Sequence, residues 1–123
     1  MATIFAYLKM LLTFLFAILR LLGFGADTVQ VELYANPASG YYWEYSYDET
    51  GVLMLSGSRY QPDTSAIFSG GGGSQKFTFR EIGEGTVNIT FEYTHVASKN
   101  VASRYVYTYH VDKEGEITLV DIK

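Results

Sequence analysis

Any catalytic chemistry in this chain would depend on histidines, hydroxyl groups and carboxylates, because its 123 residues include no cysteine. The two histidines, His95 and His110, lie on separate segments, and no metal-ligand spacing or nucleophile-elbow motif accompanies them. A lone histidine in a small domain usually serves packing or lies at the surface. We therefore expect no catalytic residue, no metal site and no cofactor, and a protein that is not an enzyme.

A run of four glycines between two serines, Ser69 to Ser74, raises the question of phosphate binding. A phosphate-binding loop of this kind leads into a helix that begins with a Lys-Ser/Thr pair. Here Gln75 to Arg80 alternates as a strand instead, with Phe77 and Phe79 on one face. A flexible linker is the alternative, but a domain boundary here would leave neither half with a core. We expect a loop whose bare backbone approaches another surface closely.

The stretch from Asn36 to Trp43, Asn-Pro-Ala-Ser-Gly-Tyr-Tyr-Trp, combines a constrained turn with an aromatic strand. Pro37 fixes its own φ and moves Asn36 out of the helical region, and Gly40 permits a backbone angle that other residues avoid. A strand-like run, Thr28 to Tyr34, precedes the turn. The turn is either an ordinary hairpin element or a contact site, because a rigid loop loses little entropy when it docks.

The N-terminal segment, residues 1–26, differs in composition from the rest of the chain. Met10 to Leu19 is predominantly apolar, a lysine precedes it, and the small-residue stretch Gly23–Ala26 follows. This pattern is typical of a signal peptide cleaved after Gly25. Alternatively, Ile4 to Phe24 forms a membrane anchor. Either interpretation implies export, whether secreted, periplasmic or anchored on the extracytoplasmic side, with membrane contact only through this segment if it is uncleaved.

The remaining residues, 27–123, are expected to form one all-β domain. The 16% aromatic content favours strands over helices. Without Lys9 and Arg20 of the N-terminal segment, the nine bases fall to seven against thirteen acids, which gives the domain a net charge of −6. An acidic domain of this kind is not expected to bind nucleic acid.

About seven short segments of this domain read as strands separated by turns, which predicts an immunoglobulin-like antiparallel β-sandwich. Trp43 is expected to anchor its core. A turn-rich link, Ser58 to Thr64, follows the third strand, and Pro62 excludes a central strand there. The expected strands are Thr28–Tyr34, Tyr41–Tyr47, Val52–Leu55, Gln75–Arg80, Gly85–Tyr93, Ser103–Val111 and Glu116–Ile122.

Several of these motifs together resemble those of the chagasin-like inhibitors of papain-type cysteine peptidases. Asn36 to Trp43 is similar to the family's Asn-Pro-Thr-Thr-Gly-aromatic-x-Trp loop, with Ala38 and Ser39 where the family usually has threonines. The glycine run resembles a Gly-x-Gly-Gly loop that is followed by a strand with an inward phenylalanine, here Phe77. Tyr60 to Asp63 is similar to a Tyr-x-Pro-Asp segment that precedes this loop in the family.

The similarity covers about residues 28–111 in order and spacing, but the third family motif departs. The family has Arg-Pro-Trp after an Asn-Leu-Thr-Tyr strand, whereas Asn88–Glu92 is followed here by Tyr93, Thr94 and His95. The imidazole ring is flat but offers less apolar area than an indole, and the arginine charge is absent. Loss of one aromatic anchor commonly costs an interface on the order of 2 kcal/mol or more, so we expect weaker or redirected binding.

The family domain usually has a further strand before the one that corresponds to Thr28–Tyr34. In this chain that strand would fall in the N-terminal segment. We expect Glu116–Ile122 to cover the sheet edge instead. Otherwise Leu19–Phe24 would have to remain attached to the domain and cover it.

The resemblance implies a monomeric inhibitor of papain-like cysteine peptidases that blocks the active-site cleft with three loops at one end of the sandwich. The Asn36–Gly40 turn would enter the cleft, with the glycine loop along one wall and Tyr93–His95 along the other. The alternative is a non-inhibitory immunoglobulin-like binding or adhesion module of the cell envelope that uses the same loops on another partner. The implied contact residues are Asn36, Pro37, Ala38, Ser39, Gly40, Tyr41, Gly70, Gly71, Gly72, Gly73, Tyr93, Thr94 and His95.

Overall fold

The computed structural model of the chain describes residues 2–21, 27–63 and 71–123. Helix α1 spans Ala2–Leu21, within the predicted signal or anchor segment. Within the described ranges, no helix combines the length and apolar character needed to cross a membrane. The predicted cleavage position and the first residue of the glycine run, Gly70, lie outside the described residues.

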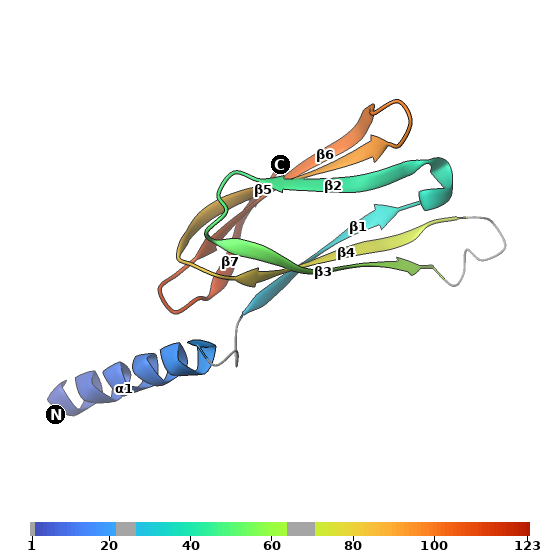
Figure 1. Ribbon diagram of the computed structural model, residues 1–123. Coiled ribbons are helices and arrows are strands. Elements are labelled where there is room, and N and C mark those ends of the chain that lie inside the picture. The colour runs from blue at the N-terminus through green and yellow to red at the C-terminus, as the bar shows by residue number, and fades with distance from the viewer. Residues whose placement is uncertain (1, 22–26, 64–70) are drawn as a thin grey trace.

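The rest of the described chain forms two antiparallel sheets that pack as a sandwich (Figure 1). The strands are β1 (Thr28–Ala35), β2 (Tyr41–Tyr47), β3 (Leu53–Pro62), β4 (Gly73–Glu81), β5 (Gly85–His95), β6 (Val101–Val111) and β7 (Ile117–Ile122). Their order is β1-β4-β3 in the three-stranded sheet and β2-β5-β6-β7 in the four-stranded sheet. This architecture confirms the predicted all-β, immunoglobulin-like sandwich.

The core consists of side chains that alternate along the facing sides of both sheets. Phe77 and Phe79 of β4 point inward, as predicted, and are 4% and 0% exposed. Both rings contact Phe91 of β5, at centroid distances of 5.2 and 6.2 Å, so aromatic packing joins the two sheets. The buried core also contains Val31, Leu33, Val52, Leu53, Val87, Ile89, Tyr109 and Val111.

Strand β3 corrects the prediction of a turn-rich link after the third strand. It continues through Ser58 to Pro62, and these residues pair with β4 from Phe77 back to Gly73. Pairing with a neighbouring strand therefore overrides the local turn preference of this stretch. Pro62 is tolerated because β3 is an edge strand, whose outer side needs no backbone N–H donor. The exclusion of a central strand at Pro62 is thus confirmed.

Strand β7 corrects a second expectation. It pairs with β6 and extends the four-stranded sheet, instead of covering the outer edge of β1. The reason is the short connection before it, in which the N–H of Asp112 donates to the carbonyl of Glu116 at 3.1 Å and folds β7 directly back onto β6. In the described part of the chain, β1 is consequently an edge strand.

The connections between strands lie at two opposite ends of the sandwich. The loop end holds the β1–β2, β3–β4 and β5–β6 connections, and the far end holds the β2–β3, β4–β5 and β6–β7 connections. At the loop end, Ala35 of β1 pairs with Gly73 of β4. Tyr41 of β2 pairs with His95 of β5. Figure 1 shows the short helix η1 (Pro37–Ser39) at this end, together with the β5–β6 hairpin.

Candidate functional site

The first loop, Asn36–Gly40, is a tight turn closed by its own backbone. The N–H of Ser39 donates to the carbonyl of Asn36 at 3.0 Å, which closes one turn of 3₁₀-helix. The N–H of Gly40 donates to the carbonyl of Pro37 at 3.1 Å. Gly40 has a φ of 84°, a left-handed conformation that strains any residue with a Cβ. All three residues of η1 are exposed, so the loop presents short side chains on a constrained backbone.

Hydrogen bonds at both ends of the first loop join it to the β5–β6 hairpin. At its start, the N–H of Asn36 donates to the phenol oxygen of Tyr93 at 2.8 Å. At its end, the carbonyl of Gly40 accepts from the N–H of Val96, also at 2.8 Å. The ring of Tyr41, directly after the loop, stacks on Tyr93 with a centroid distance of 5.2 Å. The first loop and the hairpin therefore form one structural unit.

The β5–β6 hairpin turns just beyond the contact segment predicted from the sequence. Tyr93, Thr94 and His95 form the end of β5, and the side chain of Thr94 is buried, with 3% exposure. The imidazole Nδ1 of His95 accepts a hydrogen bond of 3.2 Å from the N–H of Ser98, which closes the turn. The exposed tip consists of Val96, Ala97, Ser98, Lys99 and Asn100.

This hairpin tip contains contact candidates that no sequence motif indicated. Val96 is an apolar side chain with 56% exposure, directly beside the first loop. Lys99 has a positive φ of 63°, and its ammonium lies 3.2 Å from the hydroxyl oxygen of Tyr42. The signal for this tip is the end of the strand alternation at His95, after which Ser-Lys-Asn supplies turn-forming residues.

Two of the predicted contact glycines are required by the packing of the strands. A Cβ atom added at Gly72 would lie 2.2 Å from the carbonyl oxygen of Ala35. A Cβ atom added at Gly73 would lie 2.1 Å from the carbonyl oxygen of Gln61. Backbone atoms cannot give way at these distances without moving a strand, so only glycine fits at either position. Of the three glycines of the run that the structure describes, Gly71 is the exposed one and is therefore open to a partner.

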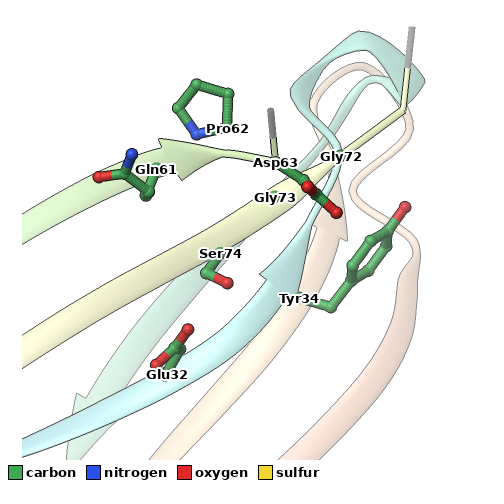
Figure 2. Close-up of a pocket in the computed structure, with 8 residues that line it drawn as sticks. All are labelled: Glu32, Tyr34, Gln61, Pro62, Asp63, Gly72, Gly73 and Ser74. Carbon is green, nitrogen blue, oxygen red and sulfur yellow. The ribbon is translucent and has the colours of Figure 1, made fainter. Parts of the chain in front are cut away.

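A hollow of about 800 Å³ lies on the outer face of the three-stranded sheet, beside the described residues of the glycine loop (Figure 2). Side chains of Glu32, Tyr34, Asp63 and Ser74 are among those that line it. Gly72 and Gly73 also line it. The surface beside the glycine loop is therefore concave.

The tyrosines with raised pKa values, Tyr107 and Tyr109, belong to strand packing. Burial, with a smaller effect from Tyr107, raises the pKa of Tyr109 to about 12, so this core phenol stays neutral at physiological pH. His110 is exposed near the far end, where its Nδ1 lies 2.9 Å from the hydroxyl of Thr86. Among the described residues, no group of three His, Cys, Asp or Glu side chains lies close enough to hold a metal ion.

The structure is a β-sandwich that presents constrained, exposed loops at one end. Residues 25–111, more than half of the chain, match the model of the chagasin family of peptidase inhibitors, I42. The chain therefore belongs to this family, which confirms the resemblance drawn from its motifs. In fold it is similar to the crystal structure of the cysteine protease inhibitor EhICP2 from Entamoeba histolytica, with a TM-score of 0.56 and 20% identity, covering 68% of this chain and 75% of that chain. No curated protein matches the chain.

Proposed function

We propose that this protein inhibits papain-like cysteine peptidases by inserting its loop end into their active-site cleft. Membership of a peptidase inhibitor family supports the class of partner. The observation that carries the mechanism is the first loop, whose exposed η1 turn is closed by its own hydrogen bonds and tied to a neighbouring hairpin. Such a loop loses little conformational entropy when it docks, and this favours tight binding.

The same geometry explains how the loop escapes cleavage. A peptidase cleaves a chain that lies extended across its catalytic groups, with the scissile carbonyl turned toward the nucleophile. The backbone of Pro37–Ser39 is coiled into a 3₁₀ turn, and the left-handed Gly40 directs the chain away into β2. To present an extended bond, the loop would have to break its internal hydrogen bonds and its bonds to Tyr93 and Val96.

The remaining contacts come from both sides of the first loop. On one side, exposed Gly71 brings an unobstructed backbone to a wall of the cleft. On the other side, the hairpin that begins at His95 supplies an apolar contact through Val96. The buried Thr94 supports this hairpin from inside. The contact residues predicted from the sequence remain predictions, and the hairpin tip is added to them.

The test is a titration of active papain with the purified full-length chain, with residual hydrolysis of a peptide substrate as the signal. We expect competitive, stoichiometric inhibition and recovery of the intact chain by mass spectrometry. Trypsin, a serine peptidase, serves as the control and should keep full activity. A folded chain that inhibits none of several papain-like peptidases would overturn the proposal and favour the alternative, a non-inhibitory binding or adhesion module.

We also propose that the protein acts outside the cytoplasm. The support is the sequence of residues 1–26, an apolar segment between single bases with small residues after it. N-terminal sequencing of the protein from its own cells tests this. A chain that begins at Ala26 would identify a cleaved signal, and an intact N-terminus in a washed membrane fraction would identify an anchor. An intact chain in the cytoplasmic fraction would contradict export.

A further inference from the structure

Tyr93 contacts the start of the first loop, at the point where the chain leaves β1. Its phenol oxygen accepts the 2.8 Å hydrogen bond from the N–H of Asn36, a residue 57 positions earlier in the sequence. This N–H lies at the outer edge of β1, where no strand of the described residues is available to accept it. The phenol therefore satisfies a partly buried backbone donor that would otherwise be left without a protein partner.

Trp43 makes an equivalent bond one step earlier along the same edge. Its indole Nε1 donates to the carbonyl of Tyr34 at 2.8 Å. In an antiparallel pair, alternate residues direct their backbone groups away from the partner strand, so Tyr34 and Asn36 both face outward. Two aromatic side chains of the four-stranded sheet thus hold the end of β1 at two consecutive outward-facing positions.

The ring of Tyr93 is itself fixed between other rings. Its centroid lies 4.7 Å from that of Trp43 and 5.2 Å from that of Tyr41. Because the ring is packed on both sides, its hydroxyl is a fixed point on the four-stranded sheet. The start of the first loop is thereby set relative to the hairpin that follows β5.

We infer that Tyr93 is a positioning residue, which acts on the peptidase through the first loop and not by direct contact. The inference rests on the proposed function. Tyr93 stands where the family pattern has an arginine, and in this chain the side chain at that position bonds to the protein's own backbone. The hydrogen bond keeps Asn36–Gly40 in the one orientation that fits the cleft.

The test is Tyr93→Phe, which removes the phenol oxygen and keeps the stacked ring. Without the bond, the loop spends only part of its time in the binding orientation, and the apparent affinity falls by that fraction. We expect about tenfold slower association with papain and a nearly unchanged dissociation rate. Loss of a direct contact would instead appear mainly as faster dissociation.

The matched control is Tyr105→Phe. The ring of Tyr105 lies 5.9 Å from that of Trp43, the ring that Tyr93 also contacts, and it forms no hydrogen bond to the first loop within the described residues. The chemical change is the same as in Tyr93→Phe, but no hydrogen bond to the first loop is lost. We therefore expect wild-type association and dissociation rates. Equal slowing of association in both variants would mean that the effect comes from the packing of the tyrosines against Trp43 and not from the hydrogen bond to Asn36. That result would overturn the inference.

Combining Tyr93→Phe with Gly40→Ala separates action through the loop from direct contact. If Tyr93 acts through the loop, its effect should shrink once the loop is already displaced, whereas effects of a direct contact should add. Additive effects would overturn the inference.

Hydrogen exchange of the Asn36 amide, measured by NMR without peptidase, tests the hydrogen bond independently of the proposed function. We expect faster exchange in Tyr93→Phe than in the wild type. If wild-type protein inhibits no papain-like peptidase, the proposed function fails while exchange still reports the bond. If exchange is unchanged, or if the wild type and Tyr93→Phe inhibit equally, the positioning role fails alone.

Discussion

The loop end and the far end of the sandwich hold their connections by different means. At the loop end, the N–H of Asn36 depends on the phenol of Tyr93, a side chain of another sheet. At the far end, the carboxylate of Asp112 accepts the N–H groups of Glu114 and Glu116, at 3.0 and 2.8 Å, within one turn of the chain. Aromatic rings from distant segments support the first connection, and the local carboxylate of Asp112 closes the β6–β7 connection.

This difference determines whether substitutions in neighbouring strands can change the geometry of a connection. A turn closed by its own residues keeps its shape whatever the neighbouring strands carry. The orientation of the first loop depends instead on Trp43 of β2 and Tyr93 of β5, which hold the end of β1. Substitutions beneath the loop can therefore retune an inhibitor, whereas substitutions at the far end should change stability alone.

The largest effect is expected for Gly73→Ala, at the start of β4. The added Cβ would lie 2.1 Å from the carbonyl oxygen of Gln61 and 2.7 Å from the Cα of Pro62, so β3 and β4 would have to separate. We expect about 3 kcal/mol lower stability, and a melting temperature lower by roughly 15 °C. Urea unfolding and calorimetry measure the two quantities.

Gly57→Ala is the control for this change. Gly57 lies in the neighbouring strand β3, where an added Cβ would meet no atom of a non-adjacent residue within 4 Å. Its stability should stay within about 0.5 kcal/mol of the wild type. Equal losses in the two variants would contradict the assignment of Gly73 to strand packing.

Two glycines have a left-handed conformation at opposite ends of the sandwich, Gly40 at the loop end and Gly115 at the far end. Gly40 has a φ of 84° and Gly115 a φ of 79°, so alanine at either should cost about 1 kcal/mol of stability. Only Gly40→Ala should weaken inhibition, by roughly tenfold or more, because its Cβ would lie 3.2 Å from Nε2 of His95 and move the loop away from the hairpin. Inhibition constants and urea unfolding check both variants.

A loss of inhibition in Gly115→Ala that matches the loss in Gly40→Ala would show that stability, and not loop geometry, limits binding. The comparison between the two ends would then fail. Preserved inhibition in Gly40→Ala would remove the first loop from the mechanism.

Features that depend on neighbouring residues could be predicted from the sequence. Strand alternation gave both sheets their members, and Asn-Pro followed by glycine indicated the first turn with its strained position at Gly40. The motifs also identified the family. Each of these signals lies within a window of about ten residues, where side-chain period and turn chemistry are decided.

Features that depend on strand register could not be predicted in this way. Pro62 lies in a strand because β3 pairs with β4. The backbone carbonyl oxygens of Ala35 and Gln61 lie so close to Gly72 and Gly73 that only glycine fits at these positions. The partner of Tyr93 is 57 residues away, and only the packing of one sheet on the other brings them together. Contact roles assigned from a motif therefore missed the structural roles of the same residues.

A smaller effect is expected for Trp43→Phe. The change removes the Nε1 donor from the carbonyl of Tyr34 and keeps an aromatic ring against Tyr93. We expect about 1 kcal/mol lower stability, and inhibition weaker by roughly threefold because the end of β1 is held at one point instead of two. Stopped-flow association with papain measures the second effect.

Thr108→Val provides the matched loss of one hydrogen bond away from the loop end. The hydroxyl of Thr108 donates to the side-chain oxygen of Asn88 at 2.6 Å. A similar loss of stability with wild-type inhibition is expected. Weakened inhibition in this variant would mean that any destabilisation reaches the loop end.

The smallest effect concerns pH, and it acts through Asp48 near the far end. The backbone N–H of Asn88, bound at 2.9 Å, and then its side-chain amide hold the pKa of Asp48 below the ordinary value of 3.8. A lowered pKa in the folded state stabilises the fold above about pH 4, and this contribution is lost as the pH falls through the lowered value. Asp48→Asn should therefore be slightly less stable at pH 7 and lose less stability between pH 5 and pH 3.

Asp121→Asn is the matched control, because that carboxylate lies at the surface, 4.0 Å from the ammonium of Lys123. Urea titrations of this variant at each pH give the reference for the loss of a surface carboxylate. Inhibition at pH 5.5 should be the same in all three proteins, because the hydrogen bonds that hold the first loop to Tyr93 and Val96 involve no carboxylate. A change of inhibition in Asp48→Asn at that pH would show that the far end affects binding at the loop end, which would contradict the distinction between them.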